Sequence, residues 1–415
     1  MRPFHYREGI LRADEVPLDQ VAARFGTPVY VYSEMAIHER YTAFSHALGP
    51  ETLLCYAVKA SSNLHLLSCL AHWGAGFDIV SGGELARVLR AGGDPQRIVF
   101  SGVGKSREEI AAALNAGIFC LNVESEAELE RVDTIASELG CRAPVALRVN
   151  PDVEPGTHRY IATGLRESKF GIPMAQAENL YLAAERWPAI DFRGIACHIG
   201  SQLTDLAPIA EAARKVRGLY ERLSKAGMAI SHLDLGGGVG IRYHDEQVPT
   251  PADYAAVLHD ALTGLPVRLV VELGRSIVGN AGVLLTRVEY LKDNEGKKFC
   301  IVDAAMNDLL RPSLYGAWHD ILPVQEAELP AETGTLDVVG PICESGDFFA
   351  RGRLLAAKAG DLLAILGAGA YGFAMASQYN SRLRPPEVLI RGNEARLIRR
   401  RETLADLLAP EENPG

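Results

Sequence analysis

The sequence has no long run of apolar residues and no stretch that looks like a signal peptide. No window approaches about 18 consecutive apolar residues, the length that a membrane-spanning helix needs. The opening segment, Met1–Ile10, includes His, Tyr, Arg and Glu and has no apolar core. We therefore expect a soluble protein with no membrane partner.

The sequence also lacks paired cysteines. Its seven cysteines are scattered, their number is odd, and no two of them form a CxxC pair. This usage argues against a disulfide framework and against a zinc site, and it is typical of a reducing compartment. We expect a cytoplasmic protein with no bound metal.

The sequence has fewer basic residues than acidic residues. The chain has 42 Lys and Arg against 52 Asp and Glu, a formal net charge of −10 at pH 7. Since phosphate contacts need a basic face, this balance argues against nucleic acid as the main partner. Hydrophobic residues make up 48% and charged residues 23%, the ordinary balance of a globular protein with a sizeable core.

Short apolar runs alternate with helical patterns over about 220 residues, as in an α/β fold. The runs are Leu53–Lys59, Gly76–Ser81, Arg97–Gly102, Ile118–Val123, Val145–Asn150, Gly194–Ile199, His232–Gly236 and Arg268–Glu272. Strands and helices in this alternation predict a TIM-type (β/α)8 barrel. A doubly wound open sheet is the alternative, but it usually has fewer strands and a glycine fingerprint after the first one.

The pattern changes after about Gly279, where strands follow one another without long helices. They are expected at Gly282–Tyr290, Lys298–Asp303, Gly334–Val339, Asp361–Ile365 and Val388–Arg391. This succession predicts a C-terminal antiparallel β domain, a β-barrel or sandwich. We expect residues 1–33 to join that domain through the strand Thr27–Ser33, residues 34–279 to form the barrel, and residues 280–415 to form the β domain. Helices are expected at Leu18–Phe25, at Glu34–Leu48 with Ser33 as N-cap, and at the terminal segment Arg399–Leu408.

Lys59 ends an apolar strand in the stretch Tyr56–Ala60. A lysine there is held on a rigid element, and desolvation would leave a neutral, nucleophilic amine for Schiff-base chemistry. A lysine that reaches into solvent at the end of a strand is the alternative, and it is the commoner case for an isolated lysine.

Polar residues also follow the other predicted strands, at the end of the barrel where functional residues gather. They are Asp78 with Ser81, Asn122 with Glu124, Arg148, His198 with Ser201, the turn Gly236–Gly238, and Glu272 with Arg275. Consecutive glycines allow backbone N–H groups to approach a phosphate, although a bare tight turn is an equal alternative. His198 alone is more often a hydrogen-bonded structural histidine, and Glu272 alone could be an ion-pair partner of Arg275.

Four further motifs lie in the β region, at Asp303–Asp308, Arg311–Tyr315, Gly340–Asp347 and Gly369–Met375. Together with the barrel motifs and in this order, they resemble the fold-type III pyridoxal-phosphate decarboxylases, the class II group of ornithine, lysine and arginine decarboxylases. The resemblance covers about Pro28 to about Ile390. Its carriers are Tyr56–Ala60, Phe77 with Asp78, His158–Gly171, His198–Gln202, Gly236–Gly238, Glu272–Arg275, Arg311–Tyr315, Cys343–Asp347 and Gly369–Tyr371. The family usually has Asn after its Lys-Ala pair, where this chain has Ser61.

The resemblance implies that Lys59 binds pyridoxal 5'-phosphate as a Schiff base, that His198 stacks on the ring and that Glu272 pairs with the pyridine nitrogen. The implied cofactor-binding set is Lys59, Asp78, His198, Ser201, Gly236, Gly237, Gly238, Glu272, Gly274, Arg275 and Tyr371. The implied substrate-binding set is Arg275, Arg311, Tyr315, Glu344 and Tyr371. Cys343 and Glu344 would come from the other subunit of a homodimer with shared active sites.

The resemblance also implies the reaction, in which a carboxylate leaves as CO2 and its electrons enter the cofactor ring. Cys343 or the released Lys59 amine would return a proton to the carbanion. Glu344 can pair with a distal ammonium while Arg275 and Arg311 bind a distal carboxylate, so we expect meso-2,6-diaminopimelate to give L-lysine.

Other activities stay open from sequence alone. Arginine, ornithine and carboxynorspermidine are alternative substrates for a decarboxylase. An amino-acid racemase would need a tyrosine opposite Lys59, and a non-catalytic pyridoxal-phosphate carrier would resemble the barrel alone. The segment Asp152–Phe170 is long and rich in Gly, Pro, His and Arg, and such loops are often functional.

Overall fold

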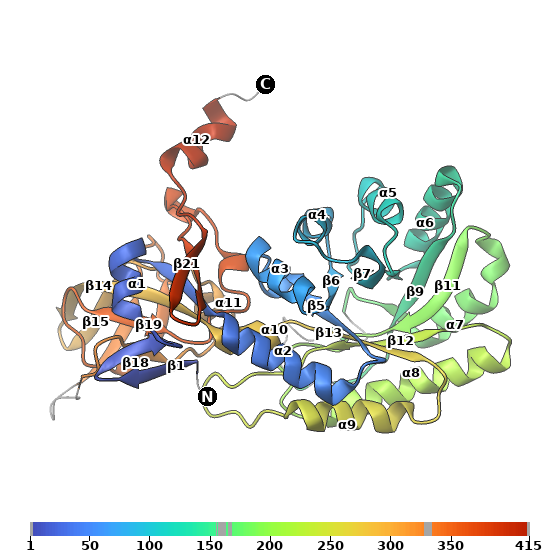
Figure 1. Ribbon diagram of the computed structural model, residues 1–415, viewed down its shortest axis with the longest axis horizontal. Coiled ribbons are helices and arrows are strands. Elements are labelled where there is room, and N and C mark those ends of the chain that lie inside the picture. Colours follow the sequence, from blue (N-terminus) through green and yellow to red (C-terminus); the bar gives the residue numbers. More distant parts are fainter. Residues whose placement is uncertain (1–2, 155, 157–162, 165–167, 328–333, 413–415) are drawn as a thin grey trace. The chain divides into compact units, whose positions relative to one another are not determined.

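The structure is a computed structural model of the chain, and it describes residues 3–154, 156, 163–164, 168–327 and 334–412 (Figure 1). The chain divides into two compact units, each with its own fold. The barrel unit comprises Tyr41–Ile241 and Gln247–Ser276; the sheet unit comprises Met1–Arg40, Arg242–Glu246 and Ile277–Gly415. The expected domain boundaries after residues 33 and 279 remain a prediction. Much of the Asp152–Phe170 segment falls outside the described residues.

The barrel unit is built on parallel strands that pair in a closed ring. They are β5 (Leu53–Ala57), β6 (Gly76–Ile79), β7 (Ile98–Phe100), β8 (Cys120–Val123), β9 (Ala143–Asn150), β11 (Ile190–Ala196), β12 (His232–Gly237) and β13 (Arg268–Leu273). Neighbours pair in this order and β13 pairs with β5, which closes the ring; the short β10 (Ile172–Pro173) adds to β9. The prediction of a (β/α)8 barrel is confirmed.

Helices precede, connect and follow these strands, and several begin at side-chain caps that the sequence provides. They are α2 (Glu34–Leu48), α3 (Leu64–His72), α4 (Gly82–Arg90), α5 (Arg107–Ala116), α6 (Glu126–Leu139), α7 (Met174–Leu182), α8 (Ala207–Lys225), α9 (Pro251–Leu262) and α10 (Arg275–Val278) (Figure 1). Ser106 and Glu109 form a capping box at the start of α5, and Thr250 and Asp253 form another at α9. Such caps satisfy the first N–H groups of a helix, which have no partner within it.

Small apolar side chains fill one layer of the barrel interior. The layer is formed by Leu53, Cys55, Val99, Cys120, Ala146, Ala196 and Val270, each at most 2% exposed. Side chains from different strands interdigitate there, so the barrel is a packed core rather than a pore. The residues that can carry chemistry lie beyond this layer, toward the ends of the strands.

The sheet unit contains a sheet in the order β18-β17-β15-β14-β4-β20-β21, with β19 paired to β14 and β16. The strands are β4 (Val29–Ser33), β14 (Gly282–Asn294), β15 (Lys297–Val302), β16 (Ile321–Pro323), β17 (Thr335–Val339), β18 (Phe348–Leu354), β19 (Leu362–Ile365), β20 (Glu387–Arg391) and β21 (Glu394–Arg399). The expected β domain is confirmed, but its sheet is mixed rather than antiparallel, because β15–β17 and β20–β4 are parallel pairs. This unit also contains β1 (Phe4–Arg7), β2 (Ile10–Ala13), β3 (Val16–Pro17), α1 (Leu18–Phe25), α11 (Arg311–Tyr315) and α12 (Leu404–Glu412).

The early strand joins this sheet, as predicted. Val31 of β4 lies opposite Val283 of β14 on one side and Val388 of β20 on the other. All three side chains are fully buried in one apolar cluster. Ser33 then caps α2, accepting a hydrogen bond from the Ala36 N–H at 3.0 Å, which confirms that expectation.

The terminal helix begins later than predicted, at Leu404 rather than Arg399. Glu394–Arg399 instead forms strand β21. The helix starts where Thr403 Oγ1 accepts the Asp406 N–H and Asp406 Oδ2 accepts the Thr403 N–H. These reciprocal bonds favour a helix start at that point. Within the described ranges, no helix combines the length and the hydropathy that crossing a membrane requires.

Candidate active site

Lys59 lies in a short turn, Val58–Ala60, that directly follows β5. Its Nζ is 2.5 Å from Oδ2 of Asp78 on the neighbouring strand β6, because the parallel register aligns Asp78 with Ala57. The Asp78 side chain is fully buried, while that of Lys59 is 35% exposed. Within the described residues, Asp78 Oδ1 is buried without a hydrogen-bond partner. Asp78 therefore has an oxygen that can still accept a hydrogen bond, next to the accessible Lys59 amine. This arrangement suits a nitrogen-containing cofactor bound at Lys59.

Glu272, at the end of β13, belongs to a buried carboxyl cluster with Asp234 of β12. Asn122 of β8 donates from Nδ2 to Asp234 Oδ2 at 3.1 Å and to Glu272 Oε1 at 3.4 Å. Ser101 Oγ donates to the same Glu272 oxygen at 3.3 Å. The cluster therefore fixes the position of the Glu272 carboxyl from three other strands or strand ends.

Burial and neighbouring charge favour the protonated form of the Glu272 carboxyl. Burial raises the pKa of Glu272 well above its usual range, and the carboxylates of Asp234 and Asp78 raise it further. Burial also raises the pKa of Asp234, to about 6, although hydrogen bonds from Gly236 and Asn122 lower it. A buried carboxyl with a raised pKa suits a basic ring nitrogen as its neighbour, which fits the predicted role of Glu272 as the partner of a pyridine nitrogen.

His198 follows β11 and is a neutral ring. Loss of solvation lowers the pKa of His198 well below its usual value, and the cations Arg148 and Lys59 lower it further. Its Nδ1 accepts the Gly237 N–H at 3.3 Å. A neutral, flat imidazole held by this bond suits stacking on an aromatic ring.

The turn Gly236–Gly238 can be built only from glycine. A Cβ on Gly237 would lie 1.9 Å from the Glu272 carbonyl oxygen, and one on Gly238 would lie 2.2 Å from the Gly200 oxygen. The Gly236 N–H donates to Asp234 Oδ1 at 2.9 Å, and the Gly237 N–H donates to His198. Two of the amides in the expected phosphate cradle are thus used to fix the shape of the turn and to link it to the carboxyl cluster.

Arg275 and Ser201 contact each other. Arg275 donates from Nε and Nη2 to Ser201 Oγ, at 3.3 and 3.0 Å. Between Arg275 and Glu272, Gly274 packs against the Lys59 turn, where an added Cβ would lie 3.0 Å from Ala60 Cβ. The structure therefore brings both ends of the Glu272–Arg275 motif next to predicted site residues of the same unit.

Two more polar residues at the strand ends, Arg148 and Glu124, form an ion pair with each other. Arg148 Nη1 donates to Glu124 Oε1 at 2.9 Å, and both side chains are buried. Glu124 also accepts the N–H groups of Gly102 and Gly171. This network connects successive loops of the barrel.

The remaining predicted residues lie in the sheet unit. Arg311 and Tyr315 mark the two ends of α11, and Arg311 is only 6% exposed. Cys343 and Glu344 are exposed in a loop where the Cys343 N–H donates to Asn380 and Glu344 accepts the Tyr379 hydroxyl at 2.9 Å. Tyr371 adopts a φ of 57°, a left-handed conformation that is uncommon for tyrosine and is seen most often at functional sites.

Several residues that contact the predicted set had no role in the prediction from sequence. They include Ser101 and Asp234 in the barrel unit, and Tyr243 and His319 in the sheet unit. For Asp234 a signal existed, because a charged residue interrupts the apolar strand just before the glycine turn. His319 has no comparable signal, since its importance depends on its contact with Arg311.

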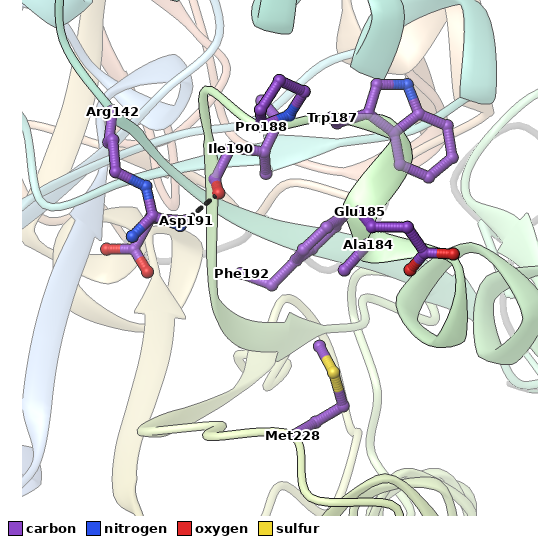
Figure 2. A pocket seen from close by; sticks show the side chains of 9 residues that line it. All are labelled: Arg142, Ala184, Glu185, Trp187, Pro188, Ile190, Asp191, Phe192 and Met228. Carbon is purple, nitrogen blue, oxygen red and sulfur yellow. Dashed lines mark hydrogen bonds between the residues drawn. The ribbon is translucent and has the colours of Figure 1, made fainter.

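A separate cavity of about 370 Å³ is lined by residues near the amino ends of β9 and β11. Figure 2 shows Arg142, Trp187, Asp191 and Phe192 around it, with the Arg142 guanidinium bonded to the Ile190 oxygen at 2.7 Å. None of the predicted site residues lines it. Conserved chemistry in such barrels occurs at the carboxyl ends of the strands, so we do not assign the active site to this cavity.

Comparisons with known proteins identify the family of the chain. Residues 34–279 match the family model of the pyridoxal-dependent decarboxylase, pyridoxal binding domain. The chain is 55% identical over 413 residues to a diaminopimelate decarboxylase of Pseudomonas fluorescens, with 99% of both chains covered.

The chain is also similar to solved structures of diaminopimelate decarboxylases. The crystal structure of diaminopimelate decarboxylase from Helicobacter pylori complexed with L-lysine has a TM-score of 0.91 and 45% identity, covering 95% of this chain and 99% of that one. A lysine/ornithine decarboxylase of Vibrio vulnificus complexed with putrescine is more distant, with a TM-score of 0.79 and 25% identity over 90% of this chain and 97% of that one. The chain therefore belongs to the pyridoxal-dependent decarboxylases and, within them, to the diaminopimelate decarboxylase family.

Proposed function

We propose that the protein is a pyridoxal-phosphate-dependent carboxy-lyase that converts meso-2,6-diaminopimelate to L-lysine and CO2, the last step of lysine biosynthesis. The observation that carries this proposal is the 55% identity to a diaminopimelate decarboxylase over 99% of both chains. A match over the full length includes the sheet unit, which supplies the predicted substrate-binding residues Arg311, Tyr315 and Glu344.

In this account the barrel residues bind and orient the cofactor. Lys59 would hold its aldehyde carbon, and Asp78 orients the Lys59 amine across a 2.5 Å ion pair. Glu272 would face the pyridine nitrogen and stabilise its positive charge. His198 would cover one face of the ring. When bound, pyridoxal phosphate accepts the electron pair left by the departing carboxylate.

The cofactor phosphate has its own set of contacts in this account. They are Ser201, the turn Gly236–Gly238, the Gly274–Arg275 backbone and the Tyr371 hydroxyl. Gly237 and Gly238 lie against the backbone of Glu272 and Gly200, and this close packing fixes the shape of the turn.

Arg275, Arg311 and Tyr315 bind the distal carboxylate of the substrate, and Glu344 binds the distal ammonium. Charge-assisted hydrogen bonds of this kind are short and selective, so they distinguish a substrate with a carboxylate at both ends from ornithine or lysine. Cys343 returns the proton to the substrate carbon, and the released Lys59 amine is the alternative donor.

We also propose that the protein acts in the cytoplasm as a homodimer whose active sites are shared. Cys343 and Glu344 are exposed on this chain, as residues that act in a partner's active site must be before assembly. Seven scattered cysteines without a CxxC pair fit a reducing compartment.

Product analysis tests the proposed reaction. Purified enzyme loaded with pyridoxal phosphate is incubated with meso-2,6-diaminopimelate, and L-lysine and CO2 are quantified. Equal amounts of both products are expected from the wild type and none from Lys59→Ala. Consumption of substrate without CO2 would refute the assignment.

A further inference from the structure

The Arg311 side chain is held by two residues of its own unit. His319 Nε2 lies 2.8 Å from Arg311 Nη1, and the guanidinium carbon lies 4.3 Å from the centre of the Tyr243 ring. His319 is fully buried and Arg311 is 6% exposed. None of the three residues is a neighbour of another in the sequence, so the fold creates this cluster.

The hydrogen bonds of His319 determine its tautomer. A guanidinium has N–H donors and no acceptor, so Nε2 must accept from Arg311 through its lone pair. The ring proton then lies on Nδ1, which is 2.7 Å from the Leu366 carbonyl oxygen and donates to it. Both ring nitrogens are satisfied, and the neutral ring is fixed against the backbone.

Tyr243 restrains the same guanidinium in a different way. Its ring provides a face for the cation, and it also meets the His319 ring edge to face, with centroids 5.3 Å apart and planes at 71°. Glu246 accepts the Tyr243 N–H at 2.9 Å and thereby fixes the backbone of this segment. Cation–π and edge-to-face contacts are favourable and directional.

These contacts matter because a free arginine side chain has many rotamers. A guanidinium that is already held in place loses less conformational entropy when it binds a carboxylate. The bond to His319 uses one of the five N–H donors of Arg311.

We propose that His319, together with Tyr243, is a positioning residue that holds the Arg311 guanidinium ready for the distal carboxylate of the substrate. The pair thereby contributes to selectivity for substrates with a carboxylate at both ends. This inference rests on the proposed function, in which Arg311 binds that carboxylate.

Two probes separate this role from a general structural one. L-Lysine retains the distal carboxylate, because decarboxylation removes the other one, whereas cadaverine has the same carbon chain and both amines but no carboxylate. Binding of each to the holoenzyme is measured by calorimetry for the wild type, His319→Leu, His319→Gln and Tyr243→Leu.

His319→Leu is expected to weaken L-lysine binding about tenfold, the effect of losing one good hydrogen bond to a charged group, and to change cadaverine binding less than about twofold. His319→Gln keeps an acceptor near the position of Nε2 and should recover most of the affinity. Tyr243→Leu should also weaken the binding of L-lysine more than the binding of cadaverine. With meso-diaminopimelate, KM should rise in both leucine variants while kcat changes little.

His232→Leu is the matched control. His232 is equally buried, at 1% exposed, at the start of β12, and neither ring nitrogen has a hydrogen-bond partner within the described residues. This variant should bind both probes as the wild type does.

Equal loss of binding of both probes in His319→Leu and His319→Gln, or no loss of L-lysine binding in either, would overturn the positioning role while leaving the proposed function intact. A wild-type holoenzyme that forms no L-lysine from meso-diaminopimelate would instead refute the proposed function, and this inference with it.

Discussion

Lys59 and Asp78 form an ion pair between the carboxyl ends of two neighbouring barrel strands, with Nζ 2.5 Å from Oδ2. The register of β5 and β6 aligns Ala57 with Asp78, so the pairing follows from the sheet itself. A lysine at the end of a strand commonly reaches into solvent. Here the pairing with Asp78 gives the Lys59 side chain a fixed direction and a buried counter-charge. This relationship supports the proposal that Lys59 is the cofactor anchor.

Replacing Lys59 should abolish covalent attachment of the cofactor. Wild-type enzyme treated with pyridoxal phosphate and then borohydride should gain one phosphopyridoxyl group per chain, measured by mass spectrometry. Lys59→Ala should gain none at the active site, whereas Lys225→Ala, which removes an exposed lysine at the end of α8, should behave as the wild type. Stoichiometric labelling of Lys59→Ala would show that another lysine is the anchor.

The glycine turn should not accept even a methyl group. In Gly237→Ala the new Cβ would meet the Glu272 carbonyl oxygen at 1.9 Å, so β12 and β13 must separate. Overpacking of this kind costs about 1–3 kcal/mol. We expect a lower thermal midpoint and weaker retention of the cofactor.

Gly104→Ala provides the comparison for this change, since a Cβ there meets nothing within 4 Å. Its stability should stay within about 0.5 kcal/mol of the wild type. Identical midpoints and cofactor content for Gly237→Ala and Gly104→Ala would be incompatible with the described turn.

Asp308 should make the stability of the sheet unit depend on pH. Burial raises the pKa of this carboxyl to about 7 in the folded chain, far above its value in an unfolded one. The folded state therefore binds the proton more tightly, and the unfolding free energy falls as pH rises through the window from about 4 to about 7. Above that window no further loss from this group is expected.

Asp308→Asn cannot ionise and should lack this component. Between pH 5 and pH 8 the wild type should lose about 2 kcal/mol more stability than Asp308→Asn, measured as thermal midpoints at a fixed scan rate. Asp205→Asn, at an exposed position before α8, is the control and should follow the wild type. Parallel pH profiles for Asp308→Asn and the wild type would disprove the buried, protonated carboxyl.

Mixed dimers test whether active sites are shared between subunits. Lys59→Ala and Cys343→Ala homodimers should each be nearly inactive. If Lys59 and Cys343 of one site come from different chains, mixing the two proteins with subunit exchange restores one intact site in each mixed dimer, about a quarter of wild-type activity overall. If native mass spectrometry confirms that mixed dimers form and they have no activity, then both residues of one active site come from the same chain.

Much of the fold could be predicted from sequence, because strand length and apolar content repeat with a regular spacing. The runs beginning at Leu53 and Arg268 correspond to β5 and β13, which close the barrel. The helix expected at Arg399 was misplaced, because Thr403 and Asp406 determine where it starts. The parallel pairs of the sheet unit could not be predicted, since strand direction depends on long connections rather than on local pattern.

The site was predictable where residues stand at strand ends, and less so where function depends on contacts across the fold. Asn122 and Glu272 are far apart in the chain, yet a hydrogen bond joins them once the barrel closes. Asp234 completes their cluster and, after burial, contributes most to raising the pKa of Glu272. His319 acts on Arg311 through a single ring nitrogen, a contact that no residue pattern indicates.

The most direct test of the central claim is CO2 release from meso-2,6-diaminopimelate, compared with ornithine, arginine and lysine at equal concentrations. The proposed charge pattern predicts a kcat/KM for meso-diaminopimelate at least about a hundredfold above the others, because unpaired buried groups penalise substrates that lack the distal carboxylate. Equal or faster decarboxylation of ornithine, arginine or lysine would contradict the account.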